Sequence, residues 1–165
     1  MFRIMTQNRN LVLVICTGNT CRSPMAAKLL EHALSAEKAP LNQLVVESAG
    51  VAAGTGSSAS DNSVAALKKF NIDLSQHRSQ PVDQKLIDRA LVILGMTDSH
   101  LETLRFHRYK NLPEHIHLFR QFVENNEGSQ IPDPFGQNFE AYQESLDSMV
   151  EAIPSILKSL KSLCS

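Results

Sequence analysis

The chain has 165 residues with a formal net charge of −1, and 42% of its residues are apolar. This length predicts one domain over 1–165, beginning with a short polar extension at 1–10, and the composition is that of a globular protein. The charge balance and an aromatic content of only 5% argue against nucleic-acid and membrane-surface partners. No segment reaches the roughly 18 apolar residues of a membrane helix, so we expect a monomeric, cytoplasmic protein.

Short apolar runs alternate along the chain with segments of helical periodicity. The runs predict strands at 11–15, 44–48, 90–96 and 115–119. The periodic segments predict helices at 25–34 and 64–70, a short helix from about residue 98, and a long helix at 139–160. Because such alternation favours parallel pairing, we expect a three-layer α/β/α fold with a parallel sheet of about four strands. Ligands of such folds bind at the carboxyl ends of the strands.

The first strand is followed by the segment C-T-G-N-T-C-R-S-P, which runs from Cys16 to Pro24. A loop of this length can curl so that its backbone N–H groups converge, and Gly18 and Asn19 tolerate the positive φ that curling needs. Converging amides at a helix N-terminus form an anion site, and the Arg22 guanidinium matches two phosphate oxygens. The predicted phosphate-binding residues are Thr17, Gly18, Asn19, Thr20, Cys21, Arg22 and Ser23.

Cys16 lies in the electrostatic field of the same loop. Amides at a helix terminus and a guanidinium favour a thiolate over a thiol, and a thiolate that faces a bound phosphorus atom is an activated nucleophile. A buried structural cysteine is the alternative, but it leaves the spacing of Gly18, Asn19 and Arg22 unexplained. A nucleotide-binding loop is excluded because neither G-x-x-x-x-G-K-[ST] nor G-x-G-x-x-G occurs here.

A carboxylate late in the chain is a candidate general acid, which displacement at phosphorus needs for its leaving group. Asp133 lies between Pro132 and Pro134, and both prolines restrict the backbone around it. An ordinary turn is the alternative for this motif alone. Together with the cysteine loop, the motif predicts that Asp133 protonates the leaving group.

Three segments resemble the low-molecular-weight protein tyrosine phosphatases over nearly the whole chain and in the same order. They are the C-x5-R-S loop, Ser48-Ala49-Gly50 and Asp133-Pro134-Phe135-Gly136. The resemblance implies that Cys16 forms a phosphocysteine without any metal or organic cofactor, that Arg22 clamps the phosphate, and that Asp133 is the general acid. It further implies a hydrogen bond from Ser23 to the thiolate and a network that braces the loop. The residues matching that network are Asn19, Ser48 and His77.

The substrate branch within this family depends on a few positions. Thr20 resembles the protein-arginine phosphatases, whereas members that act on tyrosine usually carry Ile there. Thr97 and Phe135-Gly136 also differ from the Asp and the tyrosines of many tyrosine phosphatases. In addition, the stretch 121–157 contains seven acidic residues and no Lys or Arg, which suits a guanidinium leaving group better than a phenol. We therefore expect phosphoarginine in proteins as substrate, with Thr20 and Phe135 as specificity residues; phosphotyrosine is the alternative.

Two remote alternatives and one regulatory prediction complete the sequence analysis. Arsenate reductases of this fold need a pair of resolving cysteines in mid-chain, but no cysteine occurs between Cys21 and Cys164. A non-catalytic oxyanion-binding or redox-sensing module would not need Asp133, since binding alone requires no proton donor. Cys16 and Cys21 flank the same loop, and we predict that they form a reversible disulfide under oxidation.

Overall fold

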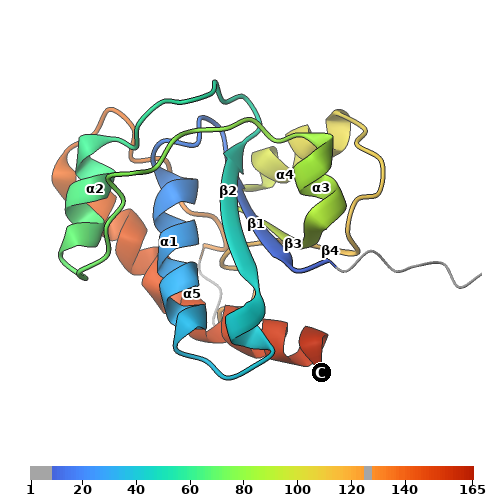
Figure 1. Cartoon of the computed structure of the whole chain (residues 1–165). Helices are drawn as coiled ribbons and strands as arrows, with labels where there is room; N and C mark the ends of the chain where they lie inside the picture. Colours follow the sequence, from blue (N-terminus) through green and yellow to red (C-terminus); the bar gives the residue numbers. More distant parts are fainter. Residues whose placement is uncertain (1–8, 125–127) are drawn as a thin grey trace, which may run out of the picture.

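The computed structural model describes residues 9–124 and 128–165, and a parallel sheet lies at its centre (Figure 1). The strand order is β2-β1-β3-β4, and each neighbouring pair is parallel. The strands are β1 (Leu11–Cys16), β2 (Val45–Gly50), β3 (Ala90–Gly95) and β4 (His115–Leu118). The helices are α1 (Arg22–Ser35), a single 3-10 turn η1 (Leu41–Gln43), α2 (Asp61–Lys68), α3 (Gln84–Arg89), α4 (Asp98–Phe106) and α5 (Phe139–Cys164).

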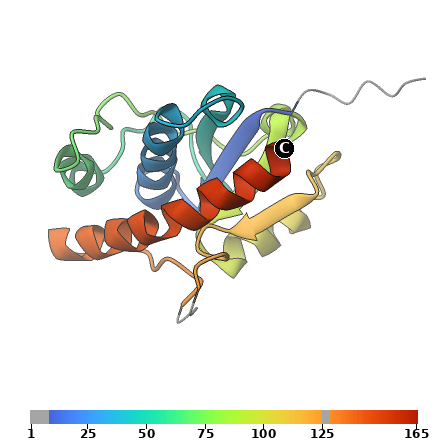
Figure 2. The same cartoon turned by 90° about the horizontal axis from the view of Figure 1, so that it is seen from below.

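The two faces of β1 separate the core into two halves, because successive side chains of a strand point to opposite sides. Val12 and Val14 pack with residues of α1 and α5, whereas Leu13 and Ile15 pack with residues of α3 and α4. Figures 1 and 2 show the resulting layers, with α1, α2 and α5 on one side of the sheet and α3 and α4 on the other. The predicted three-layer fold is confirmed.

The position of the central strands explains where a ligand can bind. The chain leaves β1 towards β2 on one side, whereas β3 and β4 follow on the other side. The carboxyl ends of β1 and β3 therefore flank a topological switch point, where open α/β sheets bind ligands. The loop after β1 begins at Thr17, and the turn into α4 begins at Met96, so both lie at this point.

The predicted elements differ from the structure at several places. The second strand is shifted from 44–48 to Val45–Gly50, because its pairing with β1 continues to Cys16 opposite Gly50. α2 ends at Lys68, so Phe70 lies in the following turn and is 45% exposed. The sequence analysis did not predict η1 or α3. α3 has only six residues, too few for a helical period, and it begins where the Asp83 carboxylate accepts the Leu86 N–H at 2.9 Å.

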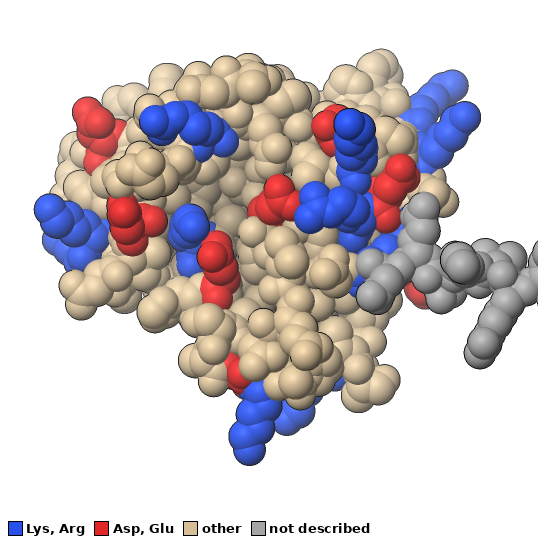
Figure 3. All heavy atoms as spheres, viewed as in Figure 1, with Lys and Arg blue, Asp and Glu red and all other residues tan. Residues whose placement is uncertain are grey.

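No described helix combines the length and apolar character that a membrane crossing requires. Figure 3 shows Lys and Arg interspersed with Asp and Glu on the face that it presents, rather than separated by sign. This face therefore has no extended region of one charge, as the balanced composition suggests.

Candidate active site

The loop between β1 and α1 curls around the side chain of Cys16. Asn19 adopts a left-handed backbone with φ 56°, whereas Gly18 does not have a positive φ, so only one of the two predicted residues supplies the turn. The curled backbone brings the Asn19 N–H to 3.3 Å from Cys16 Sγ, and Ser23 Oγ lies 2.9 Å from the same sulfur. Both contacts stabilise a thiolate, because each group can donate a hydrogen to it.

A cavity of about 210 Å³ opens above this loop. It is lined by Cys16, Thr17, Gly18, Thr20, Cys21, Arg22, Asp133 and Phe135. The tertiary structure thus brings the predicted nucleophile, clamp and acid to one cavity, although 117 positions separate Cys16 from Asp133 in the chain (133 − 16). Asn19 and Ser23 do not line it, and both are fully buried.

Asn19 is fully buried and connects the loop to two distant segments. Its Nδ2 donates to Ser23 Oγ at 2.8 Å and to Ser48 Oγ at 2.9 Å, and its Oδ1 accepts the Gln80 N–H at 3.0 Å. His77 Nε2 lies 2.7 Å from the Asn19 carbonyl oxygen. Burial lowers the pKa of His77, which favours the neutral ring, with Nε2–H donating to this carbonyl. Ser48 and His77, which the family resemblance implies as bracing residues, therefore contact the loop at Asn19. Gln80 contacts Asn19 as well.

The phosphate loop passes so close to the end of β2 that only a glycine fits at position 50. A Cβ at this position would lie 2.3 Å from the Thr17 carbonyl oxygen, closer than any real contact. The same carbonyl accepts the Ala52 N–H at 3.0 Å, and the Cys16 carbonyl accepts the Val51 N–H at 2.9 Å. The segment after β2 therefore fixes the first residues of the loop.

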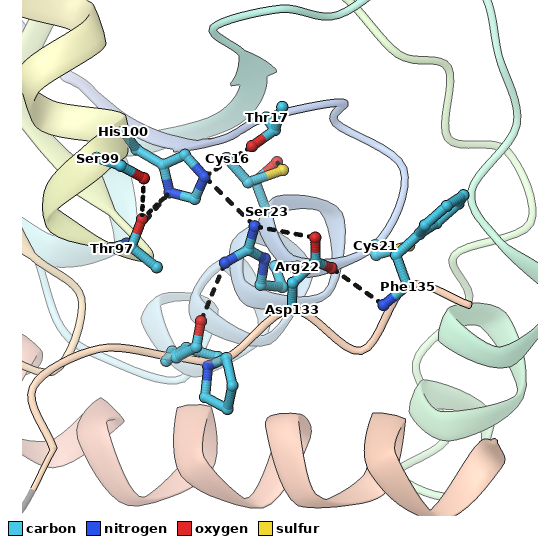
Figure 4. Close-up of polar contacts among 12 residues, drawn as sticks. Cys16, Thr17, Cys21, Arg22, Ser23, Thr97, Ser99, His100, Asp133 and Phe135 are labelled. Carbon is cyan, nitrogen blue, oxygen red and sulfur yellow. Dashed lines mark hydrogen bonds and ion pairs between the residues drawn. The ribbon is translucent and has the colours of Figure 1, made fainter. Parts of the chain in front are cut away.

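Arg22 begins α1 and is only 5% exposed. Its Nη1 donates to the Ile131 carbonyl at 3.0 Å, and its Nη2 lies 3.5 Å from Asp133 Oδ2. The main chain next to the proposed acid therefore also orients the guanidinium (Figure 4). A buried cation at the base of the cavity provides the charge that a phosphoryl group needs.

Asp133 is held more loosely than the residues of the loop. Its side chain is 51% exposed, and besides the contact with Arg22 its Oδ1 accepts the Phe135 N–H at 3.0 Å. The Phe135 ring is 71% exposed at the mouth of the cavity. Asp133 also borders a second groove of about 220 Å³, which Glu144 and Ser145 of α5 line as well. The acid therefore stands between the cavity and an open, partly acidic surface.

His100 contacts this site but was missed by the sequence analysis. It lies in the first turn of α4 and is 3% exposed, with Nε2 at 3.0 Å from Thr17 Oγ1 and at 3.3 Å from Arg22 Nη2. Burial lowers its pKa to about 4, with Arg22 contributing and Asp133 opposing. The sequence pattern Thr97-x-x-His100 could have predicted this position, because it resembles a capping box at the start of a helix. In the structure the Thr97 N–H donates to His100 Nδ1 at 3.2 Å.

Cys21 is buried at the end of the loop, directly before α1, with its Sγ 3.4 Å from the Tyr142 hydroxyl of α5. The other described cysteines are Cys16, also buried, and Cys164 at the end of α5. All three are free thiols. The structure thus gives Cys21 a packing partner, and the disulfide with Cys16 stays a prediction.

Within residues 9–124 and 128–165, no group of three or more His, Cys, Asp and Glu side chains is arranged to hold a metal ion. The groups that line the cavity include a thiol, a guanidinium and a carboxylate, and the Asn19 N–H points at the thiol. Such a set can bind a phosphoryl group, attack its phosphorus atom and protonate a leaving group.

Comparison with known proteins agrees with this arrangement. A family model described as low molecular weight phosphotyrosine protein phosphatase matches residues 11–163. A protein-arginine-phosphatase of Geobacillus stearothermophilus is 37% identical over 150 residues, which make up 91% of this chain and 95% of the relative. A solved structure of the YwlE arginine phosphatase, a variant with a phosphorylated active site serine, is 30% identical with a TM-score of 0.76. It covers 92% of this chain and 95% of its own.

A second solved structure represents the tyrosine phosphatases. The low molecular weight protein tyrosine phosphatase of T. tengcongensis is 32% identical with a TM-score of 0.79, over 90% of this chain and 98% of its own. The family match thus spans nearly all of the described residues, and relatives named for either substrate align over most of their length. The chain belongs to the low molecular weight phosphotyrosine protein phosphatase family, a family of phosphoprotein phosphatases.

Proposed function

We propose that this protein hydrolyses phosphoarginine in proteins through a phosphocysteine intermediate. The observation that carries the proposal is the convergence of Cys16, Arg22 and Asp133 on one cavity. A nucleophile, a cation for the phosphoryl oxygens and a proton donor are the three parts that such a displacement needs.

In the first step the Cys16 thiolate attacks phosphorus, and an S–P bond forms as the P–N bond breaks. The electron pair of the broken bond goes to the guanidine nitrogen, which takes a proton from Asp133. In the second step a water oxygen attacks the phosphocysteine while the Asp133 carboxylate takes a proton from that water. The S–P bond then breaks, which releases inorganic phosphate and restores the thiolate.

Two features of the cavity support a guanidinium leaving group. Thr20 lies half-buried at the cavity and has a hydroxyl that can accept from a guanidinium N–H. The groove beyond Asp133 contains the Glu144 carboxylate, and anionic surroundings favour a cation over a neutral phenol. The protein-arginine-phosphatase relative, at 37% identity, supports the same substrate.

Phosphotyrosine is the second candidate, and one observation favours it. The exposed Phe135 ring at the mouth of the cavity offers an apolar face against which a phenyl ring can stack. The T. tengcongensis relative carries the corresponding name. The two substrates differ in their leaving groups, so one residue near the leaving group should discriminate between them.

Substitution of Thr20 tests this proposal. Thr20→Ile removes the acceptor and adds bulk, so one guanidinium N–H is left unpaired at a cost of about 1–3 kcal/mol, or roughly 5- to 150-fold in relative kcat/KM. We expect kcat/KM for a phosphoarginine peptide to fall and kcat/KM for a phosphotyrosine peptide to hold or rise. Thr20→Ser, which keeps the hydroxyl, is the matched control. An unchanged ratio of the two kcat/KM values contradicts the arginine assignment.

We further propose a monomer that acts in the cytoplasm on phosphorylated proteins. The free thiols of Cys16, Cys21 and Cys164 suit a reducing compartment. Sedimentation of the purified chain tests the monomer, and a mass corresponding to a dimer at micromolar concentration would contradict it.

A further inference from the structure

His100 is a buried titratable group behind two residues of the cavity wall, Thr17 and Arg22, and the reaction steps above do not use it. It stands at the start of α4, on the β3 side of the switch point, and its ring lies between the α4 backbone and the phosphate loop (Figure 4). One ring nitrogen faces Thr97, and the other faces Thr17 and Arg22. The hydrogen-bond partners on the two sides determine which nitrogen carries the proton.

The Thr97 side of the ring favours one tautomer. The Thr97 backbone N–H lies 3.2 Å from His100 Nδ1, and a backbone N–H can only donate. Arg22 Nη2, which also can only donate, faces Nε2, so the two donors compete for the single lone pair of a neutral ring. Because the Thr97 N–H is part of the main chain and lies at the shorter distance, we assign the lone pair to Nδ1 and the proton to Nε2. A doubly protonated ring would oppose this N–H and the nearby Arg22 cation, and the pKa of His100, lowered first by burial and then by Arg22, agrees with a neutral ring.

The Thr17 side of the ring then determines the direction of a hydroxyl. His100 Nε2–H donates to Thr17 Oγ1 at 3.0 Å, which uses an acceptor position of that hydroxyl. The hydrogen of the Thr17 hydroxyl must point elsewhere, and Thr17 lines the cavity. Hydrogen bonds in such a chain strengthen one another, because each donor polarises the next.

Arg22 is affected by the same tautomer. Its Nη2 lies 3.3 Å from His100 Nε2, within hydrogen-bonding distance, but with the proton on Nε2 the ring has no lone pair left for this guanidinium N–H. His100 therefore offers the guanidinium no acceptor on that side. The Nη2 hydrogens stay available for Asp133 and for an anion in the cavity.

We propose that His100 is a positioning residue of the phosphate site, which acts by donating to Thr17 and thereby makes the Thr17 hydroxyl a donor to a phosphoryl oxygen. The proposal deepens the proposed function and rests on it for the identity of the anion. It adds a side-chain donor to the backbone amides and Arg22. His100 itself does not touch the phosphoryl group.

A matched pair of substitutions separates this role from helix capping. In His100→Asn the side-chain oxygen takes the place of Nδ1 and keeps the Thr97 N–H satisfied, but no donor reaches Thr17. In His100→Gln the side-chain amide takes the place of Nε2 and keeps the donation to Thr17 while the cap is lost. Thr17→Val removes the hydroxyl, and Thr17→Ser keeps it. Thr103→Val on the exposed side of α4 removes a bond to the Ser99 carbonyl at 2.8 Å and serves as a control outside the site.

Binding of inorganic phosphate, measured by calorimetric titration, is the readout. A hydrogen bond to an anion predicts a Kd increase of about ten-fold or more in His100→Asn and Thr17→Val, with His100→Gln and Thr17→Ser within about three-fold of wild type. The double variant of His100→Asn and Thr17→Val should bind no more weakly than either single variant, because both remove the same interaction.

Three results would overturn the proposal: wild-type phosphate affinity in His100→Asn, equal weakening in His100→Asn and His100→Gln, or single effects that multiply in the double variant. Thermal unfolding of each variant shows that it is folded. Failure of the proposed function is distinguishable, because it would appear as absent turnover of both phosphopeptides by a wild-type chain that still binds phosphate.

Discussion

The phosphate loop and the loop that carries Asp133 meet at one cavity but are built very differently. Asn19 is fully buried and is bonded through its side chain and main chain to five other residues, whereas Asp133 is 51% exposed and contacts Arg22 at 3.5 Å. The anion site is therefore preorganised, and the proposed proton donor remains accessible to water and to a leaving group. This division suits a two-step reaction, because the phosphoryl group stays in place while a leaving group is exchanged for water.

The largest expected effect is on catalysis and follows from substitution of Asp133. Asp133→Asn removes the proton donor and acceptor, and we expect kcat for a phosphoarginine peptide to fall by about 10²–10⁴-fold. The Kd for inorganic phosphate should stay close to that of wild type, because the loop around Cys16 is unchanged. Steady-state kinetics and phosphate titration measure the two quantities, and a parallel loss of both would show that the two regions are not separable.

The buried network around Asn19 in the phosphate loop predicts an effect on stability. Asn19→Ala forces an alanine into a left-handed backbone and leaves the Gln80 N–H without its acceptor, so the free energy of unfolding should fall by about 2–4 kcal/mol. Asn71→Ala is the control, because Asn71 has φ 57° in an exposed turn. It should lose only about 1 kcal/mol. Equal losses in urea unfolding would mean that the network around Asn19 adds nothing.

His100, which contacts the phosphate loop, makes stability depend on pH. Its pKa is lowered to about 4 in the folded protein from an ordinary value of 6.5, so the unfolded chain takes up the proton first as the pH falls. The free energy of unfolding should therefore decrease between about pH 6.5 and pH 4. His100→Gln lacks this ring and should show a flatter profile over that window. Urea titrations at several pH values test this, and identical slopes would contradict it.

The smallest expected effect concerns the Cys21 thiol, at the end of the loop. Cys21 is buried against Tyr142, and we predict that it forms a disulfide with Cys16 under mild peroxide, which protects the nucleophile from irreversible oxidation. Activity lost to peroxide should return with dithiothreitol in wild type but not in Cys21→Ser. Cys164→Ser is the control and should recover like wild type. Equal recovery in all three would assign Cys21 a packing role alone.

The contiguous parts of the site were predictable from the sequence. Cys16 and Arg22 are separated by five residues after a buried strand, and a loop of that length between strand and helix has few ways to fold. Local geometry then determines where the amides point. Asp133 was recognisable because two prolines and a family resemblance mark it. The strand and helix order followed from hydrophobic periodicity, except for α3, which is too short to have one.

The tertiary structure alone decided how the loop is braced and oriented. Gln80 contacts Asn19 through its backbone N–H, and Ile131 contacts Arg22 through its backbone carbonyl. Neither contact uses the side chain of Gln80 or Ile131, so the residue type at these positions does not indicate it. His100 reaches Thr17 because the carboxyl ends of β1 and β3 lie side by side, 83 positions apart in the chain (100 − 17). A sequence specifies which groups can donate or accept hydrogen bonds, whereas only the packing of the sheet determines which distant groups come within reach of one another.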